Sequence, residues 1–591
     1  MQQPPDQRIV DSLRSRRTQP ALPGVTQPTV IISPTTPLPG TIPDRRARNT
    51  WRIALQLCVL GVLLELLLLA LYPLLASTTR AGSTEQQVVK ALPSLFPWLP
   101  SLYWTNRFPA LAHLLSNVSW LNILDKTTGS SASTLLSFFV LVIASGIALL
   151  ASRLSGRVLL ERLSHAGNAL LFGLVLLLTG IFGLTMLVAP IGITVFSQDL
   201  LTYGLYGHMV AVQHVNPYGV LPTAQDVLQM LVRVRSTTPY GPVWTDISVL
   251  LALIAQNSIA STLLVFRTLG LFAHLINVML LWAILTRAKP EIRLSATLLY
   301  AWNPLILLFG IAEMHQEIVL VCIVLAAILF FQRNSPTIGW VFVLLVSLIN
   351  FLWLPLLPLF IRLMLRQSRI LRVRYRLLWL GGMLLISLVV VVLAYAPYWR
   401  SIGVAGILTQ LRRTFLQDTP VNSLDAALLH LPIASAWLTS PYHWSLLVLI
   451  LAGLFLLLGL WLADTLGLVA LFSSWILLLL GVLLPVYWPW YIIAPLVLAL
   501  CSTNSRTILL TTLLLAASLL SYYWLLTSTW TGQALVTVGL PLLIWGWILF
   551  FSSTWQMTHA QEEKKPVETR ARFSGRSRPS WFSRPSRPGR F

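Results

Sequence analysis

Long apolar runs recur along this chain from Trp51 to Phe551, and they limit its possible folds more than any other feature. Many of these runs are long enough to cross a hydrocarbon layer about 30 Å thick. No water is present inside such a layer to satisfy backbone N–H and C=O groups, so these segments must be helices. Only 10% of the residues are charged, against about 25% in a typical soluble domain. The sequence therefore predicts an all-α polytopic membrane protein.

The net charge of +22 is concentrated in two tails and in short loops between the apolar runs. That distribution is typical of the positive-inside bias of membrane proteins, and it argues against a nucleic-acid partner. Residues 1–50 and 554–591 contain too few apolar side chains to form a core. We therefore expect two disordered basic tails on the cytoplasmic side, where anionic membrane lipids are their expected partners.

Two cytoplasmic tails require an even number of crossings by the transmembrane domain, residues 51–553. The apolar segments can be arranged as about 14 transmembrane helices. This arrangement predicts a multi-pass protein of the cell membrane, with three outer loops at 77–133, 190–243 and 399–443.

Two stretches of the predicted domain do not fit a single transmembrane helix each. Residues 243–286 contain two apolar segments, although the arrangement allows only one or three crossings there. We expect one crossing at 263–286, preceded by a re-entrant or interfacial segment that lines a protein cavity. Residues 337–365 must cross twice, as two short helices that break near Asn350 and Pro355.

The outer loop 190–243 contains the best candidate for chemistry. Acidic residues are scarce, with 19 Asp and Glu in the whole chain, and Asp199 stands just beyond the end of the predicted span 167–189. A carboxylate next to the apolar layer is a candidate proton acceptor. Two alternatives stay open from position alone: a solvated loop carboxylate, or an N-cap for a helix that starts at Leu200.

Several short motifs occur in a fixed order on the predicted outer side of the membrane. They are Asp199-x-x-x-Tyr203, Asn216-Pro217-Tyr218, Tyr240-Gly241-Pro242, Trp302-Asn303-Pro304-Leu305, His315-Gln316-Glu317, Asn422-Ser423-Leu424 after Arg412-Arg413, and Tyr487-Trp488-Pro489-Trp490-Tyr491. Together they resemble the outer-loop motifs of the GT-C superfamily of membrane glycosyltransferases, most closely the polyprenol-phosphate-mannose-dependent mannosyltransferases. The resemblance covers residues 167–500.

The resemblance implies a GT-C fold and an inverting transfer of a sugar, such as the hexose mannose. The implied donor is a polyprenyl-phosphate sugar, and the implied acceptor is a hydroxyl of a glycan or glycolipid at the outer face. Asp199 would be the catalytic base. The implied substrate-binding residues are Tyr203, Asn216, Tyr218, Tyr240, His315, Glu317, Arg412, Arg413, Trp490 and Tyr491.

No cofactor is expected from the resemblance. Gln198 stands where many members carry a second acidic residue, and a single carboxylate argues against a bridging metal, although a divalent metal stays an open alternative. Glu317 stands where relatives often have Asp, which is a mild chemical change.

Cations are the other group that a phosphate-linked donor needs. Arg412 and Arg413 are the best outer candidates, because a guanidinium fork matches phosphate geometry. Arg267, within or near an apolar segment, is the second choice, since ionisable residues there are usually functional. For all three, a topology signal or a charge that extends to the membrane surface is the alternative interpretation.

Functions of other classes remain open on the sequence alone. A transporter or flippase would show internal repeats and polar residues in mid-span, whereas the polar residues here cluster in outer loops. An O-antigen-ligase-like glycan transferase and a non-catalytic scaffold are further alternatives. The sequence also leaves open the sugar, the acceptor, the linkage, the oligomeric state and the role of Glu65.

Overall fold

The computed structural model of the protein describes residues 42–77, 132–156, 164–189, 197–223, 226–232, 234–256, 258–368, 372–416, 423–425, 440–527 and 535–563. Within these residues it contains helices and no β-strand, which confirms the predicted all-α class.

Seven helices of the described residues are long and apolar enough to cross a membrane. They are α2 (Ile42–Ser77), α7 (Ala132–Ser155), α8 (His165–Leu187), α12 (Ile259–Ala288), α18 (Val373–Tyr395), α21 (Pro441–Leu462) and α22 (Leu466–Leu483). An eighth span is formed if the bent pair Pro290–Ala301 and Pro304–Ala312 is one crossing. Shorter apolar helices accompany them, so the count of about 14 crossings stays a prediction.

The second half of the described chain alternates short helices and turns. Besides the seven candidate spans, it contains η3 (Pro290–Ile292), α13 (Arg293–Ala301), α14 (Pro304–Leu307), η4 (Leu308–Ala312), α15 (Glu317–Gln332), α16 (Pro336–Ile349), η5 (Phe351–Leu356), α17 (Leu357–Gln367), α19 (Trp399–Phe415), η7 (Pro489–Ile492), α23 (Ile493–Ser502), α24 (Ser505–Thr527), η8 (Leu535–Gly539) and α25 (Leu540–Glu563).

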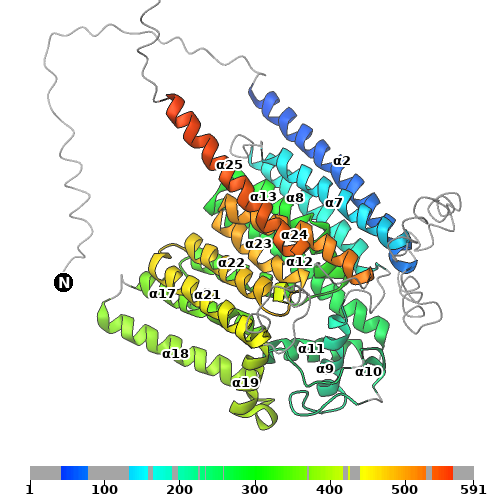
Figure 1. Cartoon of the computed structure of the whole chain (residues 1–591), viewed down its shortest axis with the longest axis vertical. Coiled ribbons are helices and arrows are strands. Elements are labelled where there is room, and N and C mark those ends of the chain that lie inside the picture. The colour runs from blue at the N-terminus through cyan, green and yellow to red at the C-terminus, as the bar shows by residue number, and fades with distance from the viewer. Residues whose placement is uncertain are drawn as a thin grey trace, which may run out of the picture.

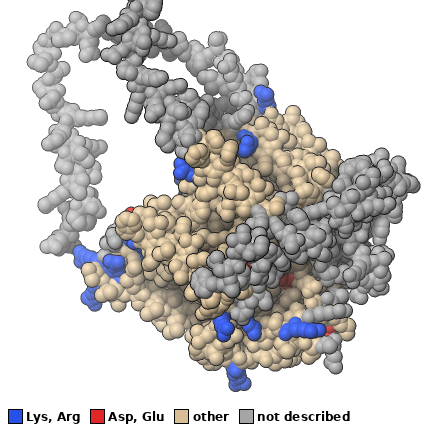
Figure 2. Space-filling model, viewed as in Figure 1, with Lys and Arg blue, Asp and Glu red and all other residues tan. Residues whose placement is uncertain are grey.

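The long helices pack into one bundle around a continuous apolar core. α2, α7 and α8 lie side by side along one edge (Figure 1), while α15, α22 and α23 pack against one another inside the bundle. α18 and α21 keep large apolar side chains exposed, such as Leu384 and Trp461 at 73% and 75% exposure. Such surfaces suit lipid contact. Figure 2 shows Lys and Arg in separate groups toward the edges of this face.

Two helix breaks follow from local side chains. Between α13 and α14 the chain bends by 50°, where Pro304 lacks an N–H and Asn303 accepts a hydrogen bond from the Leu305 N–H at 3.0 Å. Asn350 makes the equivalent bond to the Leu352 N–H, also at 3.0 Å, directly after α16 ends. The break that the sequence predicted near Asn350 is therefore confirmed.

Two of the predicted outer loops contain helices. α9 (Asp199–Ala211) and α10 (Val227–Val232) lie within 190–243, and α19 (Trp399–Phe415) lies within 399–443. α9 is buried on nearly every side. Its sequence therefore has no amphipathic pattern, which is why the sequence predicted a loop there. Together with α11 (Pro242–Ala255), these helices gather at one end of the bundle (Figure 1).

α11 packs on α9 and precedes the single long helix α12. This agrees with one long helix after a separate short segment in the ambiguous stretch 243–286. α2 begins at Ile42 and α25 continues to Glu563, so each helix extends into a stretch predicted as a tail. The predicted outer loop 77–133 lies outside the described residues apart from its ends.

Two acidic residues of the helical domain have identifiable partners. Glu65, in α2, accepts a hydrogen bond from the hydroxyl of Thr185 on α8, which gives this intramembrane carboxyl a partner. Asp464, after α21, forms ion pairs with Arg362 at 3.0 Å and Arg366 at 2.6 Å. Neither acidic group is near the predicted outer-loop motifs in sequence.

Candidate functional site

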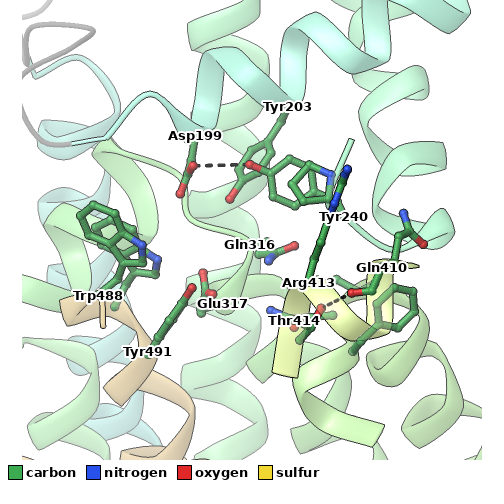
Figure 3. A pocket seen from close by; sticks show the side chains of 15 residues that line it. Asp199, Tyr203, Tyr240, Gln316, Glu317, Gln410, Arg413, Thr414, Trp488 and Tyr491 are labelled. Atoms are coloured by element: carbon green, nitrogen blue, oxygen red, sulfur yellow. Dashed lines mark hydrogen bonds between the residues drawn. The ribbon is translucent and has the colours of Figure 1, made fainter. Parts of the chain in front are cut away.

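A cavity of about 250 Å³ lies where α9, α15, α19 and η7 meet (Figure 3). Its lining includes seven predicted site residues from five separate chain segments: Asp199, Tyr203, Tyr240, Glu317, Arg413, Trp490 and Tyr491. The remaining lining residues are Pro239, Gln316, Ile349, Asn350, Phe351, Gln410, Thr414 and Trp488. The structure thus brings together motifs that are nearly 300 residues apart in sequence.

Asp199 is the first residue of α9, and Tyr203 follows one helical turn later on the same side. The spacing Asp199-x-x-x-Tyr203 therefore places both side chains at the cavity. The phenol of Tyr240 donates a hydrogen bond to Oδ1 of Asp199 at 3.4 Å. The helix is capped at Gln198 with no side-chain bond, so the N-cap interpretation of Asp199 does not describe its side chain.

A short turn between η4 and α15 brings His315 to the carboxylate of Asp199. The π-helical turn η4 widens the end of the broken helix, and Met314 then adopts a left-handed backbone conformation with φ 49°. The chain reverses there, and Nδ1 of His315 lies 3.2 Å from Oδ2 of Asp199. Nε2 of the same ring lies 3.1 Å from Oε2 of Glu313.

His315 is fully buried and does not line the cavity. Burial alone would lower the pKa of this imidazole, but the contacts with Asp199 and Glu313 outweigh burial and raise the pKa to about 9. The imidazolium is thus the favoured form at neutral pH. The position of His315 suits it to holding Asp199 in place and not to touching a substrate directly.

The aromatic wall of the cavity comes from η7. The rings of Trp488 and Trp490 stack with centroids 5.0 Å apart. Tyr491 also lines the cavity, and Figure 3 shows it beside Glu317, with Trp488 at the other end of this wall. Flat aromatic faces and buried oxygen acceptors form a surface that fits a sugar ring.

α19 supplies the cationic side of the cavity. Gln410 and Arg413 are three residues apart on this helix and so share one face. Gln410 donates to the carbonyl of Thr238 at 3.3 Å, and Arg413 donates to the hydroxyl of Thr237 at 3.4 Å. Both contacts join α19 to the segment that carries Tyr240.

Three buried oxygen atoms of the cavity lining have no hydrogen-bond partner within the described residues. They are Oε1 of Gln316, Oε2 of Glu317 and Oε1 of Gln410. Buried polar atoms are normally paired, so a ligand rich in hydroxyl donors suits these positions.

Three predicted site residues do not line the cavity in addition to His315. Tyr218 donates to the carbonyl of Tyr240 at 3.0 Å and lies 2.8 Å from the hydroxyl of Thr245, so it supports the cavity wall from behind. Asn216 accepts from the Tyr218 N–H at 3.0 Å, as expected for a turn. Arg412 also stays outside the lining, although its neighbour Arg413 belongs to it.

Arg267, the second cationic candidate, is committed to backbone carbonyls. It is buried and donates to Ala312 at 2.7 Å, Ala189 at 2.9 Å and Leu187 at 3.2 Å. These carbonyls belong to the ends of α8 and η4. The residue therefore fastens two helix ends and lies outside the cavity lining.

Three residues at or near the site were not predicted from the sequence: Glu313, Gln316 and Gln410. Gln316 stands inside a motif that was already identified, and Gln410 is one turn before Arg413, so both could have been found from helix spacing. No group of three or more metal-ligating side chains that could hold an ion occurs in the described part of the chain.

One protein-family model matches this chain. It is that of the MptA_B family, described as Alpha-(1->6)-mannopyranosyltransferase, N-terminal domain, and it matches residues 108–366. The matched range includes Asp199, His315 and Glu317 and ends before α19 and η7. No curated protein and no solved structure gives a significant match. The similarity and the apolar helices support a membrane glycosyltransferase that transfers mannose.

Proposed function

We propose that the protein transfers a mannosyl group from a polyprenyl-phosphate donor to an acceptor hydroxyl, with inversion at the anomeric carbon. The observation that carries this proposal is the position of Asp199, at the cavity and held by the buried ring of His315. The family similarity over residues 108–366 supports mannose as the sugar. The donor class, the inversion and the GT-C fold rest on the order of the outer motifs.

Asp199 acts as the general base. It accepts the proton from the acceptor hydroxyl while that oxygen attacks the anomeric carbon of the donor. The bond between this carbon and the phosphate oxygen breaks, and the electron pair leaves with polyprenyl phosphate. Proton transfer to a positioned base contributes about 10²–10⁴-fold to such a reaction. Oδ2 of Asp199 lies 3.2 Å from Nδ1 of His315. Oδ1 accepts a long hydrogen bond from Tyr240 at 3.4 Å and is the oxygen that takes the proton of the acceptor.

Arg413 binds the donor phosphate. It is the one Arg or Lys in the described lining of the cavity, and a guanidinium stabilises the charge that develops on the leaving phosphate. Thr414 beside it also lines the cavity. Glu317 and Gln316 then contact the hydroxyls of the sugar. Trp488 and Tyr491 form the aromatic wall beside its ring, because both faces of the Trp490 indole are covered by His315 and Trp488.

A lipid-linked donor fits the setting of the cavity. The surrounding helices are apolar, and α18 and α21 expose long apolar surfaces. A polyprenyl chain can follow such a surface while its phosphate reaches the helix end. A nucleotide sugar usually needs a soluble domain that binds its diphosphate, and the sequence contains neither a sizeable polar domain nor a Gly-rich phosphate loop.

The site is assigned to the outer face of the membrane. α12 begins beside α9, where Thr262 packs against Gly204, and its 30 residues span about 45 Å. Its far end carries Arg287 and Lys289. Lys and Arg favour the cytoplasmic side, which supports the outer side for the α9 end.

The first experiment is a transfer assay in proteoliposomes with a panel of polyprenyl-phosphate sugars and glycan or glycolipid acceptors. The wild-type protein is compared with Asp199→Asn and with Glu291→Gln, an exposed acidic residue outside the cavity lining as the control. We expect mannose transfer that falls about 10²–10⁴-fold in Asp199→Asn and stays unchanged in Glu291→Gln. Undiminished transfer by a folded Asp199→Asn protein removes the assigned base, and no transfer from any donor rejects the function.

A further inference from the structure

Glu313 is a buried carboxylate that touches the candidate site without lining its cavity. Its side chain is 4% exposed, and its Oε2 atom lies 3.1 Å from Nε2 of His315. The residue follows the π-helical turn η4 directly, and its N–H donates to the carbonyl of Leu308 at 2.9 Å. Its backbone is therefore tied to η4, and Oε2 is the carboxylate oxygen that contacts His315.

The imidazole of His315 lies between two carboxylates. Nδ1 faces Asp199 at 3.2 Å, and Nε2 faces Glu313 at 3.1 Å. A neutral imidazole has one N–H, so it can donate to only one of them, whereas an imidazolium can donate to both. The two carboxylates thus favour the charged ring, and the raised pKa of His315 agrees with this.

Other charged groups act on this cluster from neighbouring helices. Arg267 on α12 donates to the carbonyl of Ala312, next to Glu313, and its charge also acts on the Glu313 carboxyl. Burial raises the pKa of Glu313, and His315 and Arg267 offset part of that rise. Burial raises the pKa of Glu317 on α15 to about 7, and the charge of His315 offsets part of that rise.

We propose that Glu313 is a positioning residue of the transfer reaction, which fixes the orientation and the charge of His315 and thereby holds Asp199. This inference rests on the proposed function, because it assigns Glu313 to the same site. Glu313 does not contact the substrate. It acts through the ring, so that Oδ2 of Asp199 stays engaged while Oδ1, 3.4 Å from the Tyr240 hydroxyl, stays beside the cavity.

The proposal predicts a change in the pH profile and not only a loss of rate. Only the imidazolium can donate to Asp199 and Glu313 together, so under this proposal activity falls as pH rises through the pKa of this ring. Removing the charge of Glu313 lowers the pKa of His315. The alkaline limb of the pH–activity profile, where activity declines, then moves to lower pH. A role in packing alone would leave the limb in place.

The test compares the wild-type protein with Glu313→Gln, which keeps the size of the side chain and removes its charge. We expect kcat to fall roughly 10–100-fold, the size of effect found when a residue that orients a metal-ligating histidine is lost. The donor KM should change little, and the alkaline limb should move to lower pH. Glu291→Gln serves again as the control. An unshifted limb and wild-type kcat in a folded Glu313→Gln protein would overturn the proposal.

Glu313→Asp is the second variant, because it keeps the charge and withdraws the carboxylate by one methylene. It should lower kcat while keeping the alkaline limb close to that of the wild type. A limb that moves equally in the Asp and Gln variants would contradict the assigned role of charge.

A direct measurement of the protonation state of the His315 imidazole separates this inference from the proposed function. The ¹⁵N signal of His315 in labelled protein, assigned with His315→Gln, reports the imidazolium without any turnover. It should persist to higher pH in the wild type than in Glu313→Gln. Identical titrations would reject the role of Glu313 even if transfer is found. A shifted titration without any mannose transfer would leave the coupling intact and reject only the function.

Discussion

The imidazole of His315 lies flat against the indole of Trp490, with ring centroids 3.6 Å apart and planes inclined by 15°. An imidazolium over an aromatic face gains roughly 0.5–2 kcal/mol from the ring quadrupole. Trp490 is itself buried and lines the cavity. One indole therefore supports the charged ring and forms part of the cavity wall.

Trp490→Ala should destabilise the protein and abolish most of its transfer activity. Deleting a buried tryptophan costs about 3–5 kcal/mol, and the loss also leaves His315 without its aromatic support. The measurement is the unfolding temperature in detergent together with the transfer rate. Trp461→Ala is the matched control, because Trp461 is 75% exposed on α21 and should change neither. Equal effects of the two changes would show that the stacking has no special role.

Arg412 and Arg413 are adjacent, and only Arg413 lines the cavity. We expect Arg413→Ala to lower kcat/KM for the donor roughly 10- to 100-fold, since hydrogen bonds to charged groups are worth about 1.5–3 kcal/mol. Arg412→Ala should have a much smaller effect. The two variants carry the same change in net charge, so general electrostatic attraction of the donor cancels in the comparison. Equal losses would argue for such attraction and against a specific phosphate contact.

Gly241 allows the segment that carries Tyr240 to approach the end of α16. A Cβ atom at this position would lie 2.0 Å from the carbonyl oxygen of Leu348 and 2.8 Å from that of Ile349. Gly241→Ala should therefore displace Tyr240 and lower both transfer and stability, the latter by about 1–3 kcal/mol. Gly173→Ala on α8 is the control, because a Cβ atom there meets nothing within 4 Å. Wild-type activity in Gly241→Ala would show that the wall tolerates the shift.

Stability should fall with rising pH in a window set by His315. Its pKa is about 9 in the folded protein, above the ordinary value near 6.5. The resulting stabilisation is fully present below about pH 6.5 and is lost as pH rises toward about 9. The unfolding temperature should decline over this window, and His315→Gln should remove that part of the decline. Parallel curves for the two proteins would contradict the assignment.

The motif positions of the site could be predicted from the sequence because they depend on local spacing. Asp199 and Tyr203 are one turn apart, and His315 and Glu317 belong to one short motif that ends at the first residue of α15. Pro and Asn mark the helix breaks at Asn303 and Asn350 through their backbone chemistry. These features need no knowledge of the tertiary structure.

Other parts of the site depend on packing that leaves no periodic signal. α9 is buried all around, so its sequence does not distinguish it from a loop. Glu313 meets His315 only because a π-helical turn and a left-handed Met314 reverse the chain between α14 and α15. The sequence made Arg267 a candidate for binding the donor phosphate. Its three carbonyl partners come from segments about 45 and 80 residues away, and no local pattern predicts them.

The size of the cavity has a consequence for the products of the proposed reaction. Its 250 Å³ is below the roughly 300–1,000 Å³ of pockets that enclose a drug-sized ligand. It can hold little more than the sugar being transferred and the atoms next to it. If the acceptor is a glycan chain, most of it would therefore lie outside the cavity. The cavity would contact only the terminal sugar and would not distinguish acceptors by their length. Product length would then be set by the supply of donor and by how often the chain rebinds, and a ladder of lengths would be the expected output.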